Sequence, residues 1–227
     1  MRAIILAAGR GSRLRPLTDS VPKPLVRAGG EPLIFRHLRR LVACGITDIA
    51  VNISHLGGMI ENAAGNGDAF GARISYSKEK TALETAGGIR LALARNLLPQ
   101  EEPFLCVNAD IVCNINFAAL SLPKKSDCRL VMTPNPPRNP SGDFTLHKNG
   151  MLAPPSGETL TYSGIGIYRP QLFMHLPPEG KAKLLPILLD AVRRNAASGE
   201  KYNGLWHDTG TAESLAAAEK ALAAQQD

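Results

Sequence analysis

Short apolar runs alternate with helical patterns along the first half of the chain. Runs such as AIILA at 3–7 and FLCV at 104–107 have the length and composition of buried strands. Strands are expected at 3–7, 48–53, 73–77 and 104–107. Helices are expected at 32–44, 59–64 and 85–97, the first because its apolar residues recur at helical spacing. This alternation predicts an α/β fold, in which a mostly parallel, Rossmann-like mixed sheet carries helices on both faces.

The second half has a different pattern. The alternating segment TYSGIGIY predicts a strand at 161–168, and another is expected at 129–133. Segments rich in Pro, Gly, Asn and Ser predict turns at 134–142 and 152–157, on either side of a hairpin at 143–147. Helices are expected at 184–192 and 211–224. Because one α/β sheet can absorb 227 residues, we expect a single domain over 1–227.

The amount and distribution of charge argue against a nucleic-acid-binding protein. The chain has 44% hydrophobic and 20% charged residues and a net charge of +6. Its first forty residues hold nine Lys and Arg against two Asp and Glu, so the rest is close to neutral. A nucleic-acid-binding protein would more often combine a dense basic run with stacking aromatics, which are only 5% here. No apolar run approaches the roughly 20 residues that cross a bilayer, so we expect no membrane association and a cytoplasmic location.

The basic charge is concentrated in one loop, LAAGRGSRLRPLTDSVPKPL, at 6–25. Gly9 and Gly11 follow the first strand, but Leu14 stands where a dinucleotide-binding turn needs Gly or Ala. The loop is no Walker motif either, because no Gly-Lys-Ser/Thr follows. Backbone amides of a glycine loop can hold phosphate oxygens while Arg13 and Lys23 neutralise charge. The loop therefore predicts a polyphosphate site, against the alternative of a surface turn with solvated arginines.

Lys23 lies between Pro22 and Pro24. Both prolines restrict the backbone, and the second one favours extended geometry at Lys23 itself. We expect this ammonium group to be held in place before any ligand binds.

Two carboxylates are candidate metal ligands. Asp110 follows the apolar strand at 104–107, and Asp208 lies in the sequence Trp-His-Asp-Thr-Gly. Two carboxylates, phosphate oxygens and water are ligands that Mg²⁺ prefers. Each aspartate could instead form a cap or a turn, and Thr211 is a possible helix N-cap just after Asp208. Scattered His and Cys residues, with no C-x-x-C pair, do not indicate a zinc-type site.

Several distant segments together resemble the sugar-1-phosphate nucleotidyltransferases. The loop at 6–25 looks like their signature, and EKTALETAGG, Asn-Ala-Asp, Gly-Asp-Phe, SGIG and Trp-His-Asp-Thr-Gly are similar to later elements in the same order. The resemblance spans nearly the whole chain. It implies the nucleotide-diphospho-sugar transferase fold, with a nucleotide-binding half at about 1–110 and a sugar-binding half at about 111–227.

The resemblance also implies roles for individual residues. Lys23 and Arg13 would be catalytic, and Asp110 and Asp208 would hold Mg²⁺. The nucleotide would contact Leu6, Ala8, Gly9, Gly11, Ser12, Arg13, Lys23, Glu79, Leu83, Glu84 and Thr85. The sugar phosphate would contact Asn108, Asp143, Glu158, Ser163 and Gly164. Taken singly, Asp143 could cap a turn, Glu158 could be a solvated charge and Ser163–Gly164 could form a bulge.

The implied reaction joins a sugar-1-phosphate to a nucleoside triphosphate, and we expect a monomer. The compact chain, LETAGG and SGDF are most similar to members that use UTP and N-acetylmuramate-1-phosphate in cell-wall recycling. Ala109 replaces the usual Gly, and Ser141 stands where a basic residue often precedes Gly-Asp-Phe, which leaves the sugar open. Alternatives are another sugar-1-phosphate or phosphocholine with dTTP, GTP or CTP, or a non-catalytic nucleotide-sugar-sensing subunit.

Overall fold

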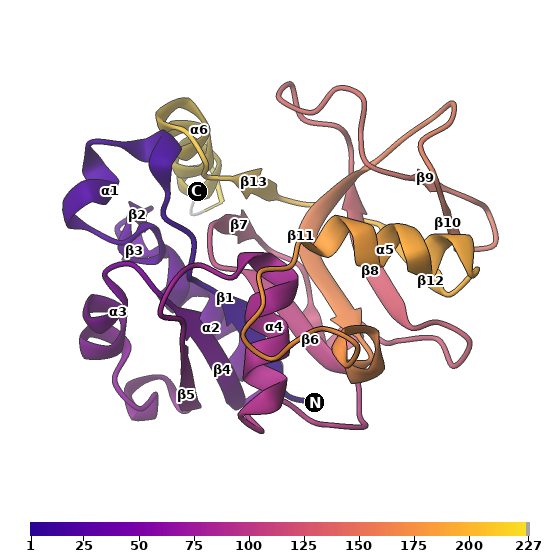
Figure 1. The fold of residues 1–227 in the computed structure, drawn as a ribbon. Helices are drawn as coiled ribbons and strands as arrows, with labels where there is room; N and C mark the ends of the chain where they lie inside the picture. Colours follow the sequence, from indigo (N-terminus) through magenta and orange to yellow (C-terminus); the bar gives the residue numbers. More distant parts are fainter. Residues whose placement is uncertain (226–227) are drawn as a thin grey trace.

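A mixed seven-stranded sheet forms the centre of the computed structural model, which describes residues 1–225 (Figure 1). In spatial order its strands are β12 (Ala197–Lys201), β8 (Cys128–Thr133), β11 (Thr161–Tyr168), β6 (Phe104–Asn108), β1 (Ala3–Leu6), β4 (Asp48–Ile53) and β5 (Arg73–Lys78). The four strands from β6 to β5 are parallel, and β11 runs antiparallel to both β6 and β8. Strands from both halves of the chain therefore share one sheet.

Helices cover both faces of this sheet because its strands are apolar on both sides. The main helices are α2 (Leu33–Ala43), α3 (Gly57–Ala64), α4 (Glu84–Ala94), α5 (Leu184–Arg193) and α6 (Ala212–Ala223), with a short α1 (Leu17–Ser20) in the first loop. In β6, Leu105 and Val107 pack into the core under α2 and α3. Phe104 and Cys106 point the other way, into the core under α4 and α5. The two cores follow from the alternation of side chains along each strand.

Three two-stranded pairs complete the fold. β7 (Ile111–Cys113) pairs antiparallel with β13 (Trp206–Asp208), which brings the C-terminal segment beside the end of β6. β2 (Arg27–Ala28) pairs with β3 (Glu31–Pro32), and β9 (Thr145–Leu146) pairs with β10 (Leu152–Ala153). Short 3-10 helices include η1 (Ser12–Leu14), η2 (Lys23–Leu25), η3 (Asp68–Phe70), η4 (Phe117–Ala119) and η5 (Pro170–Phe173). The β7–β13 pair is the one that matters for the site.

The predicted α/β fold is confirmed, with several local differences. The short strands β2, β3, β7 and β13 were not expected. Leu152–Ala153 was expected to be a turn and is strand β10 of the hairpin. Strand β12 was not expected, because its sequence ASGEK has no strand-like pattern and depends on its parallel pairing with β8. The division into one domain with two functional halves stays a prediction. Among residues 1–225, no helix is long and apolar enough to cross a bilayer.

Candidate active site

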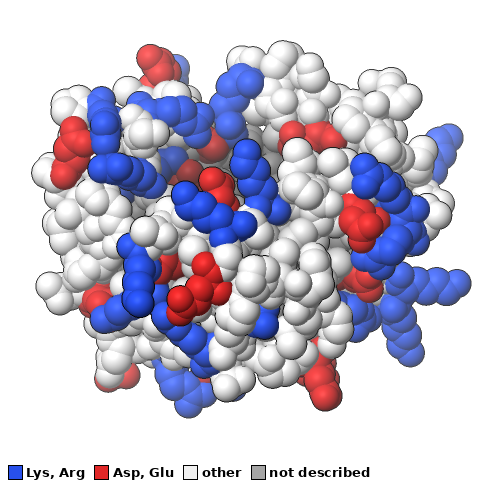
Figure 2. All heavy atoms as spheres, in the orientation of Figure 1, with Lys and Arg blue, Asp and Glu red and all other residues white. Residues whose placement is uncertain are grey.

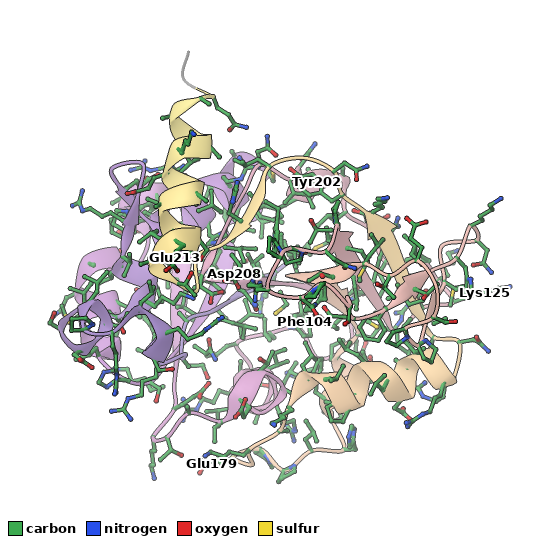
Figure 3. The ribbon with its side chains drawn as sticks, turned by 90° about the horizontal axis from the view of Figure 1, so that it is seen from above. Phe104, Lys125, Glu179, Tyr202, Asp208 and Glu213 are labelled. Atoms are coloured by element: carbon green, nitrogen blue, oxygen red, sulfur yellow. The ribbon has the colours of Figure 1, made fainter. Side chains whose placement is uncertain are left out.

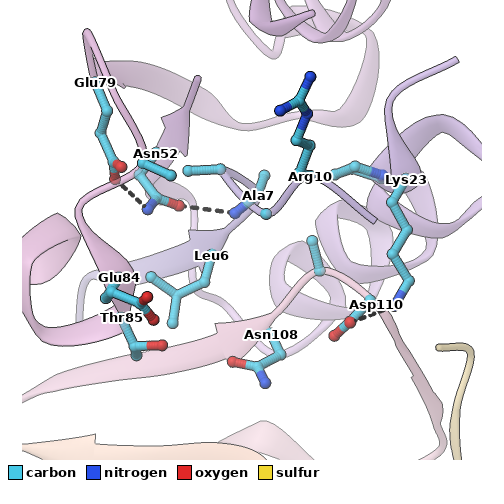
Figure 4. Close-up of a pocket in the computed structure, with 15 residues that line it drawn as sticks. Leu6, Ala7, Arg10, Lys23, Asn52, Glu79, Glu84, Thr85, Asn108 and Asp110 are labelled. Carbon is cyan, nitrogen blue, oxygen red and sulfur yellow. Dashed lines mark hydrogen bonds and ion pairs between the residues drawn. The ribbon is translucent and has the colours of Figure 1, made fainter. Parts of the chain in front are cut away.

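A cavity of about 350 Å³ opens at the carboxyl ends of β1 and β6 (Figure 4). In open α/β sheets this edge is where ligands bind. The cavity is lined by Leu6, Ala7, Ala8, Gly9, Arg10, Lys23, Pro24, Asn52, Glu79, Ala82, Glu84, Thr85, Asn108, Ala109 and Asp110. It therefore brings together the first loop, the start of α4 and the segment after β6.

The backbone of the first loop presents donors to this cavity. The Ala7 N–H donates to Asn52 Oδ1 at 2.7 Å. From Ala8 to Arg13, the backbone N–H groups donate to no acceptor within residues 1–225. Gly11 has a left-handed φ of 65°, and a Cβ there would lie 3.0 Å from Lys23 Cβ, so the glycine is required where loop and lysine touch. A run of unused amides beside a cavity is an arrangement suited to phosphate oxygens.

Lys23 is buried at the floor of the cavity. Its side chain is 7% exposed, and Nζ lies 2.5 Å from Asp110 Oδ2. Contrary to the extended geometry expected before a proline, Lys23 begins the 3-10 helix η2, while Pro22 is extended at φ −63° and ψ 140°. The ion pair and the contact with Gly11 hold the ammonium group in place, so preorganisation comes from packing as well as from the prolines.

Glu79 closes a chain of hydrogen bonds beneath the loop. Asn52 Nδ2 donates to Glu79 Oε1 at 2.7 Å, and the Leu83 N–H donates to Oε2 at 2.8 Å. Burial raises the pKa of Glu79, while these two hydrogen bonds and the Arg95 charge act in the opposite direction. Because both carboxylate oxygens accept bonds from the protein, Glu79 links the first loop, β4 and the start of α4.

Asp208 lies beside the cavity on β13. It pairs in register with Ile111, and the Thr209 N–H donates to the Asp110 carbonyl at 2.9 Å, so the two aspartates are one step apart across the β7–β13 ladder. Asp208 Oδ2 lies 2.8 Å from Arg138 Nη2. Figure 3 shows Asp208 near the first turn of α6. A Cβ built on Gly210 would approach both Arg13 Nη2 and Asp208 Oδ1, so Arg13 also lies next to this carboxylate.

The two aspartates fit a magnesium ion held largely by its nucleotide. Among residues 1–225 there is no cluster of three or more His, Cys, Asp or Glu side chains able to hold a metal. The protein thus offers two carboxylates, each already facing a cationic side chain. Mg²⁺ characteristically binds one or two carboxylates together with phosphates and water, and this donor set matches that requirement.

Of the predicted sugar-side residues, only Asn108 lines the cavity, and the others come from the second half of the chain. Gly164 has φ 82°, and a Cβ there would lie 2.6 Å from Asn108 Nδ2. The absence of a side chain at Gly164 therefore leaves room for the Asn108 amide. Ser163 is buried at the register shift between Tyr162 and Gly166, as expected of a bulge. Asp143 accepts hydrogen bonds from the Tyr162 N–H and Asn139 Nδ2. Glu158, 87% exposed, faces Lys201 on a surface loop.

The structure brings most of the predicted nucleotide-side residues into one cavity. Of the predicted nucleotide-side residues, the lining includes Leu6, Ala8, Gly9, Lys23, Glu79, Glu84 and Thr85. It also includes Asn108 of the predicted sugar side and the candidate metal ligand Asp110. The lining does not include Gly11, Ser12, Arg13, Leu83, Asp143, Glu158, Ser163, Gly164 or Asp208. Sequence reasoning missed Asn52, although a single amide inside the apolar strand DIAVNI was a detectable signal. Arg10 was missed as well, although it lies in the glycine-rich loop at 6–25.

The parallel strand ends, the unused loop amides and the buried lysine define a nucleotide-binding α/β protein of the Rossmann-like class. More specifically, the chain belongs to the nucleotidyl transferase family, whose model matches residues 2–225. It is 48% identical over 219 residues to an N-acetylmuramate alpha-1-phosphate uridylyltransferase of Neisseria meningitidis, covering 93% of this chain and 94% of that one. It is 44% identical over 119 residues to a mannose-1-phosphate guanyltransferase of Xenopus laevis, but spans only 32% of that protein.

Solved structures agree on the fold. A Bacillus anthracis protein described as a glucose-1-phosphate thymidylyltransferase superposes with a TM-score of 0.81 at 22% identity, over 97% of this chain and 95% of that one. HddC from Yersinia pseudotuberculosis superposes with a TM-score of 0.77 at 19% identity, over 97% of this chain and 99% of that one. These neighbours confirm the nucleotide-diphospho-sugar transferase fold.

Proposed function

We propose that this protein is a sugar-1-phosphate uridylyltransferase that joins N-acetylmuramate-1-phosphate to UTP and releases pyrophosphate. The observation that carries the proposal is the run of unused amides from Ala8 to Arg13, in a loop that runs into the cavity floored by Lys23 and Asp110. The Neisseria relative, which this chain matches over nearly its whole length, supports UTP and the muramate ester as the particular substrates.

The proposed roles follow the positions of the residues. Amides of the first loop bind the phosphates, and Lys23 and Arg13 neutralise charge where the reaction occurs. The pocket formed by Leu6, Glu84 and Thr85 takes the nucleoside, supported from below by Glu79 and Leu83. Asn108, Asp143, Ser163 and Gly164 shape the sugar side, where Glu158 is the most exposed member of the proposed set.

In the proposed reaction, a phosphate oxygen of the sugar-1-phosphate attacks the α-phosphorus of UTP. The new bond joins that oxygen to the α-phosphorus, and the bond from the α-phosphorus to the bridging oxygen breaks, leaving the electron pair on pyrophosphate. A phosphate monoester with a second pKa of about 6 is already largely dianionic at neutral pH, so no general base is needed. Catalysis then consists of positioning two anions and neutralising their charge, which Lys23 and Arg13 perform.

Asp110 and Asp208 would hold Mg²⁺, which supplies charge neutralisation at the phosphates when bound. Lys23 would remain the protein cation beside Asp110, because its ammonium group is buried and paired with that carboxylate. We accordingly propose a magnesium-dependent enzyme.

The proposed partners are UTP and the sugar phosphate, with neither nucleic acid nor membrane. We further propose that the protein works as a monomer. Since UTP is a cytoplasmic substrate and muramate a cell-wall sugar, we propose that the reaction belongs to peptidoglycan recycling in the cytoplasm.

The proposal is tested by pyrophosphate release from a substrate panel with Mg²⁺. UTP, ATP, GTP, CTP and dTTP are each paired with N-acetylmuramate-1-phosphate, N-acetylglucosamine-1-phosphate and glucose-1-phosphate. Release confined largely to UTP and the muramate ester is expected. Release with another pair would contradict the particular substrates while keeping the transferase, and release from no pair would favour a sensing subunit.

A further inference from the structure

Arg138 joins the second half of the chain to the candidate active site. It lies in the Pro-rich segment 134–142, and its Nη2 is 2.8 Å from Asp208 Oδ2. The Asp208 side chain is 14% exposed, whereas that of Arg138 is 40% exposed. Figure 2 shows Lys and Arg side chains bordering a hollow on one face of the molecule, with Asp or Glu side chains inside it. Arg138, from the second half of the chain, thus pairs with one candidate metal ligand, as Lys23 from the first half pairs with the other.

The segment that carries Arg138 is anchored on both sides. Asn135 Nδ2 donates to Thr159 Oγ1 at 3.0 Å, and Asn135 Oδ1 accepts from Thr161 Oγ1 at 2.9 Å. On the other side, Asn139 Nδ2 donates to Asp143 Oδ1 at 3.0 Å. Four prolines at 134, 136, 137 and 140 restrict the backbone further. The guanidinium group is therefore presented by a segment fixed to the start of β11, in the half expected to bind the sugar.

Most of the donor capacity of Arg138 is unused. A guanidinium group has five N–H donors, and the ion pair with Asp208 engages one of its nitrogens. Within residues 1–225 the Arg138 side chain makes no other hydrogen bond or ion pair. Lys23, by contrast, is buried against Asp110. Arg138 is therefore oriented by Asp208 and still has free N–H donors with which it could bind a second anion on the sugar side.

Resting on the proposed function, we propose that Arg138 binds the phosphate monoester of the sugar substrate and that Asp208 orients it. The UTP phosphates already have the loop amides and Lys23, whereas the sugar phosphate must be brought to the same place from the second half. A planar guanidinium group can bind such a phosphate through two parallel hydrogen bonds. Asp208 is one ladder step from Asp110, so a phosphate at Arg138 lies beside the charges that would surround the α-phosphorus.

The rival reading assigns Arg138 to the lactyl carboxylate of muramate. That carboxylate is attached to a different ring carbon from the phosphate, so it points away from the reacting phosphorus. The position of Arg138 on Asp208, among the candidate metal ligands, favours the phosphate. The two readings differ in one measurable respect, since N-acetylglucosamine-1-phosphate has the same phosphate and no carboxylate.

The test compares Arg138→Gln and Arg138→Lys with the wild-type protein on both sugar phosphates. Arg138→Gln is expected to raise KM for the muramate ester roughly 10- to 100-fold, the loss typical of a hydrogen bond between charged groups, and to weaken binding of both esters by a similar factor. KM for UTP should stay within about twofold, and Arg138→Lys should recover part of the loss because it keeps the charge. Arg73→Gln is the matched control, since Arg73 is an exposed arginine paired with Asp48 at the sheet edge.

A binding measurement separates this proposal from the proposed function. Isothermal titration of each ester into protein saturated with α,β-imido-UTP measures sugar-phosphate affinity without turnover, and the Tm of each variant verifies folding. Equal weakening of both esters in Arg138→Gln is the expected result. Unchanged affinity, or weakening of the muramate ester alone, would overturn the assignment to the phosphate. If the wild-type protein binds neither ester and releases no pyrophosphate, the proposed function itself is wrong.

Discussion

Lys23 is the residue on which the proposed chemistry depends most. It is the buried cation at the floor of the cavity, and its partner Asp110 is a candidate metal ligand. Lys23→Ala is expected to lower kcat by roughly 10²- to 10³-fold, by analogy with the loss of one preorganised oxyanion donor. Steady-state kinetics on the preferred substrate pair measures this, with Tm as the check on folding.

The matched control is Lys125→Ala, at an exposed lysine far from Asp208 (Figure 3). Its kcat should equal that of the wild-type protein. A folded Lys23→Ala variant with near-normal turnover would show that Lys23 has no catalytic role.

His37 makes a separate prediction about stability. Burial on α2 lowers its pKa to about 4, and the nearby Asp110 carboxylate offsets this only in part. The unfolded chain binds a proton near pH 6.5, whereas the folded chain does not bind it until about pH 4, so the free energy of unfolding falls as pH falls through this window. Between pH 7 and pH 5 the His37 contribution should fall by about 2 kcal/mol.

Urea unfolding of His37→Leu at both pH values tests this expectation. The substitution should remove most of that pH dependence, whatever its effect on stability at pH 7. His147→Leu, at an exposed loop histidine, should leave the pH dependence as it is. An identical pH dependence in His37→Leu and the wild-type protein would contradict the assignment of the effect to His37.

Among the elements, α4 packs closely against the site because Gly88 has no side chain. A Cβ on Gly88 would lie 2.6 Å from both Asn52 Nδ2 and Glu79 Oε1, where it would break the hydrogen bond that supports the first loop. Gly88→Ala is therefore expected to raise KM for UTP about tenfold and to lower the free energy of unfolding by about 1–3 kcal/mol, as overpacking typically does.

Gly58→Ala in α3 is the matched control for Gly88→Ala, since nothing lies within 4 Å of its added Cβ. This exposed helical position should gain up to about 1 kcal/mol in stability and keep the wild-type KM. Kinetics and urea unfolding of both variants give the comparison. If both substitutions behave alike, α4 does not support the loop in this way.

Elements with a local apolar pattern could be predicted from the sequence, whereas elements held by pairing with a distant strand could not. β4, β11 and α2 carry their own apolar period and were predicted almost to the residue. β12 carries none, because it is held by parallel pairing with β8, and no local pattern encodes that partner. In the site, the loop glycines and Lys23 were visible as a motif, whereas Asn52 acquires its role only when β4 lies beside β1.

For the whole molecule, the shared sheet predicts cooperative unfolding. β11 of the second half pairs with β6 of the first, and beside Trp206 on β13 the Thr209 N–H donates to the Asp110 carbonyl at 2.9 Å, so both halves are joined at several points. Trp206 is the only tryptophan of the chain and reports this junction by fluorescence. Urea midpoints from Trp206 fluorescence and far-UV circular dichroism should coincide. Two separate transitions would contradict the single domain over 1–227.

In the proposed reaction, the whole molecule brings two phosphates together and transfers a uridylyl group from UTP to the sugar phosphate. The most direct test is a ³¹P NMR spectrum of UTP and N-acetylmuramate-1-phosphate incubated with the protein and Mg²⁺. We expect equal amounts of a UDP-sugar and pyrophosphate, both absent when Mg²⁺ is chelated. UMP with pyrophosphate, or UDP with inorganic phosphate, in the presence of unreacted sugar phosphate would contradict it, because either result is hydrolysis without transfer.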